Sequence, residues 1–79
     1  MIAIKDIHQL GQLMRQQRRK QHLRQDDLAD ALGTSHVFLR KVERGEAQQL
    51  QRLFALLDDL GIKLYATTPD SPLGNETDA

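Results

Sequence analysis

Basic and imidazole side chains recur at helical spacing in the segment Ser35–Gly45, whose sequence is SHVFLRKVERG. If this segment forms a helix, at about 100° per residue, then His36, Arg40 and Arg44 fall within about 80° of one another on one face. A guanidinium group can donate two hydrogen bonds to guanine, and an imidazole can donate or accept one. The methyl groups of Val37 could contact a thymine methyl group. The alternative interpretation is a solvated basic helix face without a ligand.

The elements around this segment favour the first interpretation. Its apolar residues cluster on the opposite face and predict a buried side, made of Phe38, Leu39 and Val42. Ser35 can cap the start of the helix, and Gly45 can end it. A preceding short helix is predicted over Gln25–Leu32 and ends at Gly33. Two short helices joined by a tight turn form a helix-turn-helix arrangement, in which the second helix enters the DNA major groove.

Three further elements complete the predicted all-α fold. Asp6 followed by Gln9 resembles a capping box, so a first helix is expected from Ile7 to about His22. A fourth helix is expected over residues 48–60, because its leucines recur every three or four positions and Gly61 follows. Residues 62–66 alternate apolar and polar side chains, which is typical of a strand.

We therefore expect one domain over residues 1–66, with four to five helices and one short C-terminal strand. Residues 67–79 contain two prolines and three acidic residues without an apolar period, which predicts a flexible acidic tail.

The charges of the chain cancel overall but are unevenly distributed. Residues 1–52 carry ten basic and six acidic side chains, a balance of +4, whereas residues 53–79 carry one and five, a balance of −4. A basic front and an acidic rear favour a DNA-binding protein that binds in one orientation.

Composition also excludes several classes of function. The 79 residues include no cysteine, which excludes disulfides and thiolate metal sites. No apolar run reaches the ~20 residues of a membrane helix, so we expect a cytoplasmic protein without a membrane partner. His8, His22 and His36 lack the spacing of metal ligands, and we find no catalytic motif. We therefore expect no metal, no cofactor and no enzymatic activity.

The chain resembles the XRE family, which includes Cro and many phage repressors. The resemblance covers residues 7–61, and its most specific parts are the Gln25-x-x-Leu28-Ala29 core, the Leu32-Gly33 turn and the Glu43-Arg44-Gly45 end of the third helix. It implies a lambda-repressor-like fold and binding to double-stranded DNA. It also implies a base-reading set made of Ser35, His36, Val37, Arg40 and Lys41. By position in the family, Gln25 and Arg44 are expected at DNA phosphates. Arg24 replaces the Thr that is common in the family, which removes a helix cap, and it is expected to add a phosphate contact. A structural pair between the first and third helices is expected to consist of Arg18 and Glu43.

The end of the chain resembles a narrower group. Residues 61–66 are similar to the strand that follows the fourth helix in HipB-like antitoxins. This similarity implies a homodimer that represses its own operon at an inverted-repeat operator on the bacterial nucleoid, and that binds a HipA-type kinase toxin. We expect strands from two subunits to pair through Ile62, Leu64, Tyr65 and Ala66.

Several alternatives stay open. The strand could instead pair with the N-terminal arm, Ile2–Ile4, of its own chain. The protein could be a stand-alone phage or plasmid regulator, or a helical adaptor that binds only protein.

Overall fold

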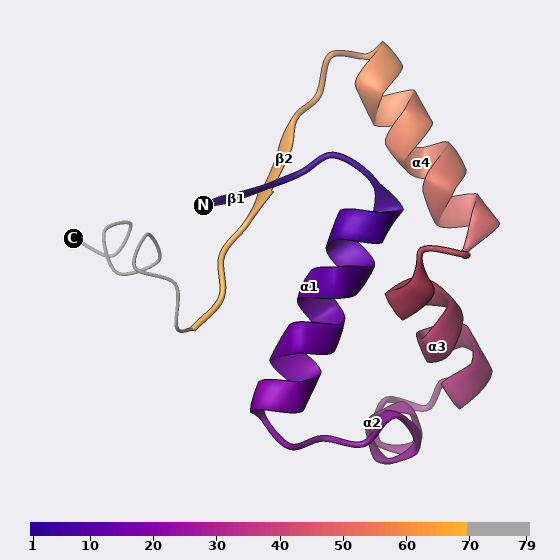
Figure 1. Cartoon of the computed structure of the whole chain (residues 1–79). Helices are drawn as coiled ribbons and strands as arrows, with labels where there is room; N and C mark the ends of the chain where they lie inside the picture. The colour runs from indigo at the N-terminus through magenta and orange to yellow at the C-terminus, as the bar shows by residue number, and fades with distance from the viewer. Residues whose placement is uncertain (70–79) are drawn as a thin grey trace.

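The computed structural model describes residues 1–69 as four helices and two short strands. In chain order these are β1 (Ile2–Ile4), α1 (Ile7–Lys20), α2 (Gln25–Leu32), α3 (His36–Arg44), α4 (Gln48–Asp59) and β2 (Leu64–Ala66). The long helix α1 contacts α3, α4 and β1, and α2 packs on α3 at one end of α1 (Figure 1). The predicted helical fold is confirmed, with four helices and a two-stranded sheet.

Capping side chains near the helix starts explain why the predicted bounds are nearly correct. The Asp6 carboxylate accepts a hydrogen bond of 2.9 Å from the Gln9 N–H, and the Gln9 side chain accepts one of 2.6 Å from the Lys5 N–H. The Ser35 hydroxyl accepts a hydrogen bond of 3.0 Å from the Phe38 N–H at the start of α3. Each cap satisfies N–H groups that have no partner within the helix. Only α1 differs clearly, because it ends at Lys20 rather than near His22.

The turn between α2 and α3 depends on Gly33. This glycine has φ 71°, in the left-handed region that residues with a Cβ rarely adopt. The next N–H, that of Thr34, donates a 3.0 Å hydrogen bond back to the carbonyl of Ala29. The pattern is a Schellman motif, which ends one helix and starts the next within three residues. It sets the angle at which α3 leaves α2.

The core lies where α1, α3, α4 and β1 meet. Its buried residues are Ile4, Ile7, Val42 and Phe54, and partly buried apolar residues pack around them: Leu10, Leu13, Met14, Ala47, Leu50 and Ala66. Leu39 is buried as predicted, but the prediction for Phe38 is wrong, because this residue is 50% exposed. Phe38 lines a hollow beside the α3–α4 loop, where its neighbours are mostly polar.

The strand prediction needs a correction. β2 spans Leu64–Ala66 rather than residues 62–66, because the Ile62 N–H donates 2.9 Å to the Leu57 carbonyl and so belongs to the end of α4. β2 pairs antiparallel with β1 of the same chain, with Ile4 opposite Leu64. One edge of β2 is therefore occupied by the N-terminal arm of the same chain and not by a strand of a second subunit. This pairing also places the buried Ile4 side chain in the core.

The opposite edge of β2 has no strand beside it within residues 1–69. Most of the predicted tail, residues 70–79, lies outside the described residues. In the part of the chain that is described, no helix is long and apolar enough to cross a membrane.

Candidate nucleic-acid interface

Arginines from three helices line one hollow on the surface. The hollow has a volume of about 640 Å³ and lies between the end of α1, the start of α2 and the outer face of α3. We call it the basic groove, and its lining residues are Arg15, Arg18, Arg19, Arg24, Gln25, Asp26, His36, Arg40, Glu43 and Arg44. Six of these ten residues are arginines, and two are acidic, so the lining favours an anionic ligand.

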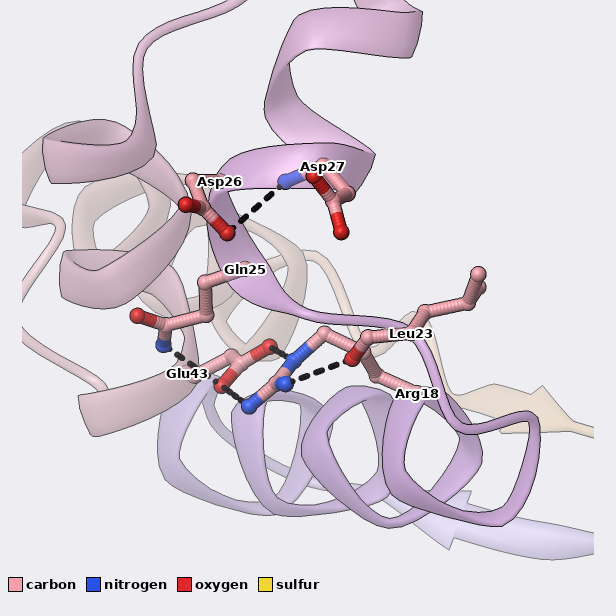
Figure 2. Close-up of polar contacts among 6 residues, drawn as sticks. All are labelled: Arg18, Leu23, Gln25, Asp26, Asp27 and Glu43. Carbon is pink, nitrogen blue, oxygen red and sulfur yellow. Dashed lines mark hydrogen bonds and ion pairs between the residues drawn. The ribbon is translucent and has the colours of Figure 1, made fainter.

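A buried carboxylate at the floor of the groove joins the three helices. The Nε of Arg18 donates 2.6 Å to Oε2 of Glu43, and a second guanidinium nitrogen donates 2.9 Å to Oε1 (Figure 2). The Gln25 amide donates 3.0 Å to the same Oε1, and Arg18 also donates 2.9 Å to the carbonyl of Leu23. The structure thus brings together the expected pair of α1 and α3, and adds α2 to it through Gln25.

The hydrogen bonds outweigh burial in setting the charge of Glu43. Burial alone would raise the pKa of the Glu43 carboxyl, but the hydrogen bonds from Arg18 and Gln25 hold that pKa below its usual range. The hydrogen bond to Glu43 in turn raises the pKa of the Arg18 guanidinium. Both groups are therefore charged at neutral pH, and they neutralise each other inside the protein.

Four of the other five arginines of the groove keep their charge available to a ligand. Within residues 1–69, Arg15, Arg19, Arg40 and Arg44 take part in no ion pair. All four are exposed. Because Arg18 and Glu43 cancel each other, these four side chains dominate the potential of the groove. The groove can therefore attract phosphate groups and, through α3, donate hydrogen bonds to base edges.

The predicted base-reading residues do not all lie in the groove. His36 and Arg40 line it, one turn apart on α3. Lys41 lies instead in the hollow beside the α3–α4 loop, together with Phe38. Val37 is 39% exposed but outside the groove lining, and the Ser35 hydroxyl is used to cap α3.

The residues predicted at phosphates all line the groove, at its edges and floor. Arg24 precedes α2 and is exposed, and its guanidinium lies 3.4 Å from the carboxylate of Asp26. Arg44 is the last residue of α3 and is exposed. Gln25 differs from the expectation, because its amide faces Glu43 rather than the open groove. One of its two amide hydrogens remains for a ligand.

Three residues that shape this site were not predicted from the sequence. Arg15 and Arg19 line the groove from α1, and their four-residue spacing, with Arg18 between them, was the available signal. Gly11 is buried where α1 crosses α3, and a Cβ there would clash with the carbonyl oxygen of Val42 and lie 2.7 Å from that of Glu43. A glycine within an amphipathic helix is the sequence signal for such a close approach.

Comparison with known proteins agrees with this geometry. The profile of a helix-turn-helix family matches residues 14–66, which is more than half of the chain and includes α2, α3 and α4. Neither the curated proteins nor the solved structures include a match. The chain therefore belongs to this helix-turn-helix family, of the XRE type of DNA-binding transcription regulators.

Proposed function

We propose that the protein is a dimeric, sequence-specific repressor in which α3 reads the bases of an inverted-repeat operator. The observation that carries this proposal is the basic groove, where exposed arginines of α1 and α3 line the same hollow as His36. In this assignment, His36 and Arg40 contact base edges, with Val37 and Lys41 beside them on α3. Arg24, Gln25 and Arg44 contact phosphates at the edges of the groove.

The division between base and phosphate contacts has a direct test. Arg40→Ala removes a central side chain of the groove, and Arg52→Ala is its control, because Arg52 is also exposed but lies on α4 outside the groove. We expect Arg40→Ala to cost about 1–3 kcal/mol on the operator and to relax discrimination at one base pair. Fluorescence anisotropy with operator and scrambled duplexes measures both terms. If Arg40→Ala and Arg52→Ala weaken binding equally, α3 is not the reading helix.

Dimerisation is supported by an exposed apolar surface away from the groove. Leu53 and Leu56 of α4 and Leu60, which follows its last residue, recur at a spacing of three and four, and they are 45%, 56% and 64% exposed. The neighbouring Leu57 lines a hollow of about 420 Å³ that is shared with Ile62, Leu64 and Tyr65. We call these seven residues the dimer face. Exposed apolar patches of this kind mark interaction surfaces.

A second copy of the chain would cover the dimer face and extend the sheet. The edge of β2 that β1 does not occupy can pair with the same edge of a partner's strand, as exposed strand edges do. Ala66 would support this pairing from the core side, where it packs on the buried cluster. A two-fold axis through this edge would give two symmetric basic grooves, each suited to one half of an inverted repeat.

The dimer face can be tested without removing a strand. Leu56→Glu places a charge at its centre, and Leu32→Glu is the control, because Leu32 is 69% exposed on α2 and lies outside the dimer face. We expect sedimentation velocity to show a dimer for the native chain and for Leu32→Glu, and a monomer for Leu56→Glu. A native chain that stays monomeric at high concentration would reject the dimer.

We further propose that this repressor is the antitoxin of its operon and binds a HipA-type kinase toxin in the bacterial cytoplasm. The support is the resemblance of residues 61–66 to HipB-like antitoxins. Co-purification of the tagged chain with the product of the adjoining gene tests this role. A chain that binds its operator but captures no kinase would be a stand-alone regulator.

A further inference from the structure

The basic groove contains one acidic side chain that is not neutralised within the protein core. Its two acids differ in exposure, since the Glu43 side chain is 3% exposed and the Asp26 side chain 54% exposed. Glu43 is bound by Arg18 and Gln25. Asp26 faces solvent at the start of α2, among the arginines that would approach DNA phosphates.

The Asp26 carboxylate also accepts hydrogen bonds from the donors that a DNA phosphate would bind. One carboxylate oxygen accepts a 3.0 Å hydrogen bond from the Asp27 N–H in the first turn of α2 (Figure 2). The other oxygen lies 3.4 Å from a guanidinium nitrogen of Arg24. The first turn of a helix binds phosphate through such N–H groups, and arginine binds it through its guanidinium. The Asp26 carboxylate thus lies where a phosphate oxygen would bind.

We propose that Asp26 competes with the DNA backbone for Arg24 and for the start of α2, and so limits the affinity of the protein for every duplex. This inference rests on the proposed function as a DNA-binding repressor. Phosphate contacts carry no sequence information. Asp26 therefore lowers the sequence-independent part of the affinity and leaves the choice of operator to α3.

Two variants of α2 separate this effect from a change in overall charge. Asp26→Asn removes the charge but keeps an oxygen that can accept from the Asp27 N–H, so the start of α2 is retained. Asp30→Asn is the matched control, since Asp30 is exposed on the same helix and is absent from the groove lining. Both variants change the net charge by one. Only Asp26 contacts Arg24 and the Asp27 N–H, so a gain confined to Asp26→Asn reflects the loss of these contacts and not a change in the charge of α2.

Fluorescence anisotropy with operator and scrambled duplexes, over a series of salt concentrations, measures the effect. We expect Asp26→Asn to bind both duplexes about 2- to 5-fold more tightly, the order expected for removing one like-charge contact at an exposed site. The dependence of log K on log salt should steepen by up to about one unit, because Arg24 is released to bind a phosphate. In an Arg24→Ala background, the gain should shrink. Asp30→Asn should bind as the native chain does.

The outcomes distinguish this inference from the proposed function. If the native chain prefers its operator but Asp26→Asn binds no more tightly, only the inference is overturned. An equal gain for Asp30→Asn, or a gain confined to one of the two duplexes, also overturns it. If the native chain binds neither duplex, the proposed function fails and the inference fails with it.

Discussion

Removing the carboxylate of Glu43 should destabilise the protein even when no DNA is present. The side chain of Arg18 is 12% exposed, so Glu43→Ala leaves a partly buried guanidinium whose remaining partner is the carbonyl of Leu23. Removing one partner of a fully buried pair costs about 3–5 kcal/mol, and because this pair is partly buried at the groove we expect the lower end of that range. For a domain of this size, a loss of about 3 kcal/mol lowers Tm by roughly 12–24 °C. A loss of this size is a large part of the ~5–15 kcal/mol that holds a typical protein folded.

Acid should weaken the same interaction. Because the pKa of Glu43 is lower in the folded state, ionised Glu43 contributes stability that is fully present above its ordinary value of 4.5. This contribution is lost as the pH falls from 4.5 through the folded-state pKa. Glu43→Gln keeps the shape of the side chain but cannot ionise. The stability difference between the native chain and Glu43→Gln should therefore be constant near neutral pH and shrink below pH 4.5.

Urea unfolding followed by circular dichroism, at several pH values, measures these differences. A double-mutant cycle that combines Glu43→Ala with Arg18→Ala isolates the energy of the pair. We expect a clear coupling energy, since the two side chains share two hydrogen bonds. A coupling energy of zero, or a Glu43→Gln difference that does not change with pH, would refute this reasoning.

Three further variants test other parts of the structure. Gly11→Ala should lower Tm without altering the helix signal, because its Cβ would lie 2.7 Å from the carbonyl oxygen of Glu43 and push α1 from α3; an unchanged Tm would contradict the close crossing. Ser35→Ala should cost about 0.5–2 kcal/mol of unfolding free energy in urea, because it removes the cap of α3; a cost of zero would exclude the cap as a source of stability. Arg44→Ala should weaken binding to all duplexes alike and reduce the salt dependence by about one unit, as measured by anisotropy; an unchanged salt dependence would remove it from the phosphate contacts.

The parts of the fold that depend on local signals could be predicted from the sequence. The starts of α1 and α3 follow from Asp6 and Ser35, whose side chains bond to N–H groups three residues along the chain. The turn follows from Gly33, because few other residues adopt its φ. Such contacts span a few residues, so their sequence patterns determine them.

Contacts between distant segments were harder to predict. The partner of β2 depends on which strand the rest of the fold places beside it. The alternation of residues 62–66 is compatible with pairing to β1 or to a strand of a second subunit. The exposure of Phe38 depends on how far the α3–α4 loop extends over α3, which the helical period does not determine.

In the candidate site, too, the contacts within one helix could be predicted and those between helices could not. His36 and Arg40 share a face because they lie one turn apart on α3, and the period of a helix alone predicts this. Arg15 and Arg19 join them only because α1 crosses α3 closely at Gly11. The α3 residues of the groove could therefore be predicted from one helix alone, and the α1 residues could not.

Selection of bound duplexes from a random DNA pool tests the central claim most directly. The native chain should enrich one inverted repeat, with half-site centres roughly 34–36 Å apart along the DNA, or a multiple of this distance. Arg40→Ala should enrich a motif that has lost preference at one position of each half-site. Enrichment of no motif by the native chain, or of an identical motif by Arg40→Ala, would contradict the assignment of α3 as the helix that reads DNA.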